Sequence, residues 1–226
     1  MSRPRRIVAV NFHGIGTPER ALEPGEAPFW IDEGRFRDIV GQIAAHPARE
    51  RIRITFDDGN RSDRTIALPV LQARGLRADF FVLTDRIGQP GALDAADIRA
   101  LRAAGMGIGS HGVAHRHWSR LDAAALREEL AGSKTVLEAL LGEKVTAAAV
   151  PFGSYSRGVL TSLRDCGYTA AWTSDGGTAD PDAFLRPRTS VRGDMAPEAI
   201  TALLEARMPP LRRLRRVLGM AHKRLL

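Results

Sequence analysis

The chain has a single cysteine and no long apolar run. One cysteine among 226 residues excludes an internal disulfide framework. Nothing near Cys166 would lower the pKa of a thiol, so we expect a core residue there and not a nucleophile. No run approaches the ~18 apolar residues that span a membrane, and the apolar stretch after the charged N-terminus is too short for a signal peptide. The sequence therefore predicts a cytoplasmic protein.

Acidic residues are absent from the last twenty positions. Residues 207–226 carry seven Lys or Arg, which leaves 26 bases against 26 acids in residues 1–206, so the net charge of +7 lies in the tail. A neutral body gives no charge argument for a nucleic-acid-binding fold, and we expect no specific nucleic-acid partner. The length fits one domain, residues 1–206, followed by the basic tail.

The tail has the pattern of an amphipathic helix. Its apolar residues recur at helical spacing among the basic ones: Leu211, Leu214, Val217, Leu218, Ala221 and Leu225. Such a helix either lies on an anionic membrane surface, at the inner face of the membrane, or packs its apolar stripe against the body of the protein. The sequence leaves both arrangements open.

Strand-like and helix-like segments alternate along the body. The expected strands are Arg6–His13, Ile52–Phe56, Asp79–Leu83, Gly107–Ser110, Val145–Val150, Thr169–Thr173 and Leu185–Val191. The expected helices are Glu33–Ala45, Asp63–Arg74, Asp94–Ala104, Ala123–Leu141, Arg157–Cys166 with Ser156 as its N-cap, and Pro197–Arg207. This alternation predicts an α/β fold with a parallel sheet, closed as a barrel or left open. The long Gly14–Trp30 connection is typical of a lid or a binding loop.

Polar residues follow four of the predicted strands. His13, the pair Asp57 and Asp58, His111, and the turn Pro151–Gly153 each stand at a strand end. In a barrel of parallel strands the carboxyl ends converge on one face, where active sites of such folds form. We therefore expect these residues to share one pocket.

Asp58, His111 and His115 form a candidate metal site. Two imidazoles four residues apart stack on one side of a helical turn, and a carboxylate with two imidazoles suits a divalent metal. Neighbouring side chains on a strand point to opposite sides, so Asp57 is a separate candidate for the general base. The alternatives are a plain Asp-Asp-Gly-Asn turn and a histidine-rich surface turn.

Three segments resemble the first motifs of the polysaccharide deacetylases, the NodB-homology or family 4 carbohydrate esterases. They are Thr55–Gly59, Ser110-His111 with His115, and Val150–Tyr155. The resemblance implies a distorted (β/α)7 barrel that removes an N-acetyl group from an amino sugar with one divalent metal, zinc or else cobalt or nickel. By matching position, the resemblance implies Asp57 as the base, Asp58, His111 and His115 as metal ligands, and the Phe152 backbone N–H as an oxyanion donor. We also expect substrate contacts from Pro151, Tyr155 and Trp30.

The chain departs from the family pattern at two positions that matter for catalysis. The arginine that usually precedes the Pro-aromatic-Gly turn and braces the base is missing, and Arg188 in the last strand resembles a late arginine of some family branches. We therefore expect Arg188 to replace the missing arginine that braces the base. The alternative is that Arg188 is a solvated charge at the edge of a strand. The histidine that usually acts as general acid is also missing, and we assign that role to His13, expecting it to face the pocket opposite Asp57. The alternative is a histidine that fixes the Gly14–Trp30 loop.

The predicted function is amide hydrolysis on an N-acylated amino sugar, carried by a polysaccharide, an oligosaccharide or a glycolipid. A deformylase acting on a lipid-linked amino sugar would share this chemistry. A sugar-binding barrel without turnover is the alternative from another class. The missing acid and arginine favour that binding barrel, whereas the intact Asp57, which binding would not require, argues against it.

Overall fold

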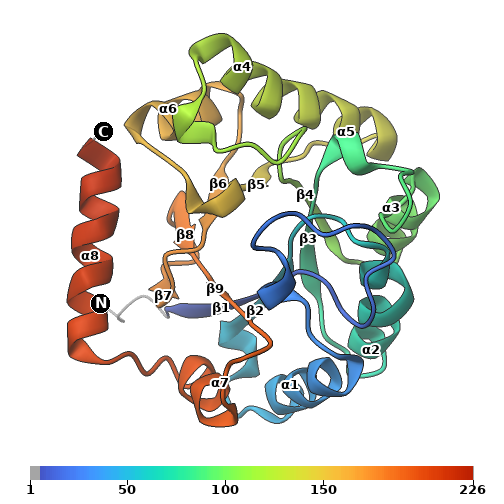
Figure 1. Cartoon of the computed structure of the whole chain (residues 1–226), viewed down its shortest axis with the longest axis vertical. Coiled ribbons are helices and arrows are strands. Elements are labelled where there is room, and N and C mark those ends of the chain that lie inside the picture. Colours follow the sequence, from blue (N-terminus) through green and yellow to red (C-terminus); the bar gives the residue numbers. More distant parts are fainter. Residues whose placement is uncertain (1–5, 226) are drawn as a thin grey trace.

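A ring of parallel strands surrounded by helices forms the body of the protein. The computed structural model describes residues 6–225 (Figure 1). Neighbouring strands follow the chain order and pair in parallel: β1 (Ile7–Phe12), β2 (Ile52–Phe56), β3 (Ala78–Val82), β4 (Gly107–Ser110), β5 (Ala147–Ala149) and β6 (Ala170–Thr173). The predicted α/β barrel is confirmed.

The last predicted strand, Leu185–Val191, is divided in two, and its halves bring the ends of the sheet together. β8 (Leu185–Pro187) pairs with β6, whereas β9 (Thr189–Ser190) pairs with β1. Arg188 lies between the halves, where its backbone N–H donates to Thr173 O at 2.7 Å. The short β7 (Thr178–Ala179), antiparallel to β1, has too weak a pattern to be found in the sequence.

The helices cover the outside of the ring (Figure 1). They are α1 (Glu33–Ala45), α2 (Leu68–Gln72), α3 (Ala95–Ala103), α4 (Ala123–Arg127), α5 (Ser133–Leu141), α6 (Arg157–Asp165), α7 (Pro197–Leu204) and α8 (Pro210–Leu225). The Ser156 side chain caps α6, as predicted, by accepting from Val159 N. The predicted segments at 63–74 and 123–141 are helical, but each contains a π-helical turn, Asp63–Ala67 in the first and Glu128–Gly132 in the second.

Side chains alternate between the inside and the outside of the ring. On β1, Val8, Val10 and Phe12 pack in the large cluster under the helices, whereas Ile7 and Ala9 belong to a smaller, separate cluster. Phenylalanines continue the outer layer across neighbouring strands, and the rings of Phe56 and Phe80 stack with centroids 4.6 Å apart. This layer fixes the register that sends the residues after the strands to one rim of the barrel.

The basic helix α8 lies along one side of the body (Figure 1), and its leucines and Val217 are exposed. Its contact face contains the buried Met220, and Lys223 donates to Asp175 Oδ1 at 2.8 Å and to Gly153 O at 3.0 Å. Leu211 and Leu218, on the opposite face of the helix, are more than 60% exposed. The helix therefore docks through Met220 and basic side chains, and the arrangement in which its apolar stripe packs inward is wrong. Among residues 6–225, no helix combines the length and the apolar character needed to cross a bilayer.

Candidate active site

Asp57 lies inside the barrel in a buried network of polar side chains. Arg188 Nη1 and Nη2 donate to Asp57 Oδ1 and Oδ2 at 2.7 and 2.8 Å, and Asn11 Nδ2 donates to Oδ2 at 3.0 Å. Asn11 Oδ1 in turn accepts from Arg188 and from Thr55, which fixes its orientation. Asp57 and Arg188 are almost completely buried, so Arg188 is no solvated strand-edge charge and clamps the carboxylate with two parallel hydrogen bonds.

The charge of Arg188 decides the ionisation state of Asp57. Burial alone would raise the pKa of this carboxyl, but Arg188 and, to a smaller extent, His111 and His13 outweigh burial and hold the pKa well below its ordinary value. Asp57 is therefore a carboxylate at neutral pH.

Asp58, His111 and His115 converge on one point at the rim. Asp58 adopts φ 79°, and its Oδ1 lies 3.5 Å from His111 Nε2 and 3.7 Å from His115 Nε2. The ligand atoms of the three side chains all lie within 4.8 Å of one another. Asp58 Oδ1 is buried without a hydrogen-bond partner, which is costly unless a cation occupies the site. The three side chains thus fit a divalent metal.

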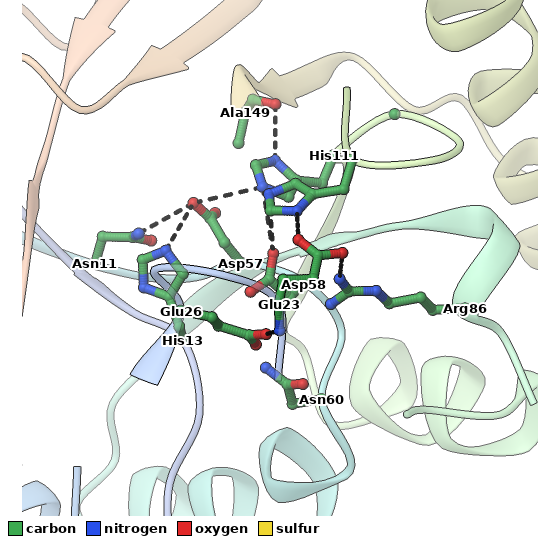
Figure 2. Close-up of polar contacts among 12 residues, drawn as sticks. Asn11, His13, Glu23, Glu26, Asp57, Asp58, Asn60, Arg86, His111 and Ala149 are labelled. Carbon is green, nitrogen blue, oxygen red and sulfur yellow. Dashed lines mark hydrogen bonds and ion pairs between the residues drawn. The ribbon is translucent and has the colours of Figure 1, made fainter. Parts of the chain in front are cut away.

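The two histidines are held in the form that binds metal. His111 Nδ1 lies 2.9 Å from Ala149 O (Figure 2), and His115 Nδ1 lies 2.6 Å from Glu23 Oε2, so both Nε2 atoms face Asp58. Burial, opposed by Asp57 and Asp58, lowers the pKa of His111 to about 4. At neutral pH this imidazole is neutral and can donate its lone pair.

Glu129, in the π-helical turn, holds the loop that contains both histidines. Its carboxylate accepts from the backbone of Val113 at 2.8 Å and of Ala114 at 3.3 Å. Gly112, between His111 and Val113, has φ 92°, and a Cβ at that position would be 2.5 Å from Glu129 Oε2. The positive φ, which strains any residue with a Cβ, and this close approach together favour glycine at the position.

The predicted Gly14–Trp30 loop covers one side of the site, and we call it the cap loop. Arg20 binds the Glu26 carboxylate and donates to Asn60 Oδ1 at 2.9 Å. Burial would raise the pKa of Glu26, but its hydrogen bonds from Arg20 and from Glu23 N lower that pKa to about 2. The resulting ion pair fixes the loop beside the metal-ligand cluster.

A cavity of about 490 Å³ opens between the cap loop and the strand ends. His13, Asp57, Asp58, His111, His115, Phe152 and Arg188 are among its lining residues. The structure thus brings together the predicted base, brace, ligands and acid. Phe29 and Phe152 present aromatic rings, Phe152 lying with its centroid 4.3 Å from that of His115.

His13 borders Asp57 and does not face it across the cavity. Its Nε2 lies 4.0 Å from Asp57 Oδ2, and its ring packs on Phe29 with centroids 4.8 Å apart. The other ring nitrogen, Nδ1, is buried without a partner, so the loop-fixing alternative has no hydrogen bond to support it.

The three predicted substrate contacts are not among the residues that line this cavity. Trp30 packs on Gly14 and donates from Nε1 to Glu26 Oε1, so it supports the cap loop. Tyr155 is buried, and its hydroxyl donates to Asp175 Oδ2 at 2.9 Å. Pro151 is buried beneath the exposed Phe152. Substrate contact by these residues stays a prediction, and Phe29 and Phe152 are better placed for it.

Asn11 and Glu23 are the residues that sequence reasoning missed. Asn11 is the one polar residue within Ile7–Phe12, a signal strong enough to be noticed. Glu23 stands in a loop without periodicity, and nothing in the chain indicates that it reaches His115.

Comparison with known proteins identifies the family. The sequence model of the polysaccharide deacetylases matches residues 44–171, more than half of the chain, which therefore belongs to this family of hydrolases. YxkH of Bacillus subtilis is 23% identical over 219 residues, which cover 90% of this chain and 78% of the relative. A chitin deacetylase of Pestalotiopsis sp is 30% identical over 126 residues, 56% of this chain and 42% of the relative.

Solved structures confirm the barrel. The deacetylase PplD of Streptococcus pyogenes, in complex with acetate, superposes with a TM-score of 0.76 at 21% identity, covering 92% of this chain and all of that one. BC0361, a polysaccharide deacetylase from Bacillus cereus, superposes with a TM-score of 0.74 at 22% identity. The match covers 88% of this chain and 69% of that one.

Proposed function

We propose that this protein is a metal-dependent amidase that removes an N-acetyl or related N-acyl group from an amino sugar. One observation supports this above the others: Asp57, clamped by Arg188, lies beside the cluster of Asp58, His111 and His115 in one cavity. A barrel that only bound sugars would have no need of an ionised carboxylate held next to a metal site.

The side chains divide the chemistry among them. A divalent metal held by Asp58, His111 and His115 would polarise the amide carbonyl and acidify a water. Asp57, at 4.0 Å from His111 Nε2, is near enough to that cluster to take a proton from the attacking water. The Phe152 N–H is our candidate donor to the oxyanion, and its ring forms part of the cavity wall.

His13 is our candidate for the general acid. An amide nitrogen leaves only when it is protonated, so a donor must face the cavity. His13 lines the cavity beside Asp57, a position from which the proton gained by the base can be passed on to the leaving amine. Zinc is our first choice for the metal, with cobalt or nickel as alternatives, because imidazole nitrogens suit all three ions.

Acetate release from N-acetylglucosamine oligosaccharides, after loading with zinc or cobalt, tests the proposal. We expect turnover by the wild-type protein, metal without turnover in Asp57→Asn, and loss of stoichiometric metal in His111→Ala. Formate released from an N-formyl sugar, with no acetate, would identify the deformylase alternative instead. Binding of the oligosaccharide with neither product would leave a sugar-binding barrel.

We also propose that α8 contacts an anionic membrane surface. The observation behind this is the outward position of its leucines beside basic side chains, an arrangement typical of interfacial helices. A second copy of the chain is a poor partner for this face, because two acid-free helices would bring arginines together. The cytoplasmic location, and the inner face of the membrane as the surface concerned, stay predictions from the sequence.

A further inference from the structure

Glu23 lies outside every motif, yet it touches a predicted metal ligand. From the cap loop its Oε2 reaches His115 Nδ1 at 2.6 Å, and its other oxygen accepts from Arg86 (Figure 2). On the opposite edge of the same ring, His115 Nε2 faces Asp58 Oδ1. Glu23 thus binds the Nδ1 edge of the His115 ring, and the Nε2 edge of that ring points into the site.

We infer that Glu23 is a positioning residue that orients His115 and couples the cap loop to the metal centre. The inference rests on the metal site of the proposed function. A carboxylate that accepts from Nδ1–H fixes the tautomer in which Nε2 carries the lone pair, and it makes that nitrogen a stronger donor.

The two histidines differ in what holds them. His111 Nδ1 contacts the backbone oxygen of Ala149, the last residue of β5, so a strand of the barrel holds this ring. His115 Nδ1 meets a side chain from a loop about ninety residues earlier in the chain. His115 is therefore correctly oriented only while the cap loop is in place, and the loop becomes part of the metal site.

Hydrogen bonds from two directions determine the position of Glu23. Within the loop, Glu23 N donates to Glu26 Oε2 at 2.8 Å, and Arg20 connects Glu26 to Asn60, two residues after Asp58. On the other side, Arg86 belongs to a turn, Thr84–Arg86, whose backbone binds the histidine loop. Three separate segments thus meet at one carboxylate.

Coupling of this kind is reciprocal. If the loop strengthens metal binding, then bound metal stabilises the closed loop by the same free energy. Glu23, Pro24, Gly25 and Glu26 all line the cavity, so metal loading also secures one wall of the substrate site.

Zinc affinity, measured by competition with a chromophoric chelator, tests the positioning role. We expect Glu23→Ala to weaken zinc binding by about 10- to 100-fold, the range for a lost carboxylate behind a histidine ligand. Glu23→Gln should weaken it less, because the amide still accepts a hydrogen bond without the charge. Glu19→Gln is the matched control, since Glu19 lies in the same loop, has an exposed side chain and pairs with Arg61 at 3.8 Å, away from His115.

The outcomes separate this inference from the proposed function. Wild-type zinc affinity in Glu23→Ala, or an equal loss in Glu19→Gln, would overturn the inference and leave the metal site intact. A wild-type protein that binds no zinc would overturn both. If the apoprotein of Glu23→Ala has a lowered melting temperature, the zinc affinity of the near-isosteric Glu23→Gln is the test. Weaker zinc binding than in the wild type would support the inference, and wild-type affinity would overturn it.

Hydrogen exchange in residues 16–30 gives a readout that does not depend on activity. We expect zinc to slow exchange there in the wild type and in Glu19→Gln, and to leave it unchanged in Glu23→Ala at saturating zinc. Equal slowing in Glu23→Ala would show that the loop responds to metal without Glu23 and would contradict the coupling.

Discussion

Both carboxylate oxygens of Asp57 are bound by donors before any substrate arrives. Arg188 occupies both, and Asn11 adds a third hydrogen bond. A carboxylate in this position is a weak base, because each donor stabilises its charged form. It therefore suits a reaction in which the proton comes from a strongly acidified donor, as in the proposed metal-assisted mechanism.

Removal of Arg188 should shift the pH dependence of activity. Arg188 lowers the pKa of Asp57, so in Arg188→Gln that pKa rises and Asp57 becomes protonated at a higher pH than in the wild type. We expect the acid limb of kcat/KM to move to higher pH while the metal content stays at one equivalent. An unchanged acid limb would show that Arg188 does not control the base.

Removal of the His13 imidazole should slow catalysis and spare the metal. A positioned general acid is worth about 10²- to 10⁴-fold, and His13 pairs with Asp57 and packs on Phe29 rather than belonging to the predicted ligand set. We expect a fall of that size in kcat for His13→Ala, with metal content unchanged by elemental analysis. A fully active variant would transfer the role to a water or to another acid in the cavity.

At the level of the element, α8 reverses the usual orientation of an amphipathic helix. Arg216 and Lys223 contact the body beside the buried Met220, and Lys223 reaches Asp175, a side chain of the cavity wall. Arg212, near the start of the same helix, also lines the cavity. The helix thus connects the rim of the active site to an exposed apolar face.

Two outward leucines test the membrane contact without disturbing the docked face. The double variant Leu211→Gln/Leu218→Gln should lose sedimentation with anionic liposomes, because the apolar part of the binding energy is removed. Val136→Gln, at an exposed apolar position on α5 and outside this helix, is the control for a polar substitution at the surface. Equal sedimentation of all three proteins, or equal binding to neutral liposomes, would contradict a membrane role for this face.

At the level of the whole molecule, the phenylalanine layer should dominate stability. Phe56 is fully buried and contacts Phe12, Phe36 and Phe80. Phe56→Ala should lower the free energy of unfolding by about 3–5 kcal/mol, measured by urea denaturation. Val136→Ala, at a position 46% exposed, should change it by less than about 0.5 kcal/mol. Similar losses in both variants would show that this layer is not the core of the barrel.

The sequence predicts the elements well where one periodicity covers the whole segment. Strands β2 and β4 and helix α1 have the predicted bounds. The residues at the strand ends also meet as expected, because parallel strands bring their carboxyl ends to one rim.

The remaining features depend on contacts that local patterns do not encode. The change of partner at Arg188 divides a segment that reads as one strand, since pairing with β6 and with β1 leaves the same alternation of side chains. The π-helical turn at Glu128–Gly132 brings Glu129 to the histidine loop, a tertiary requirement. Glu23 lies in a loop, and its contact with His115 is likewise a tertiary contact that no local pattern encodes.

The position of Arg188 also bears on how relatives of this protein can be found. The family motif usually places an arginine just before the Pro-aromatic-Gly turn, after β5. In this chain the guanidinium that contacts Asp57 comes from Arg188, where β8 gives way to β9. What the proposed chemistry requires is a positive charge against the first aspartate, and the barrel can supply it from more than one place in the chain. A search for active members of the family should therefore ask which arginine reaches that aspartate in three dimensions, and chains without the motif arginine should not be set aside as inactive.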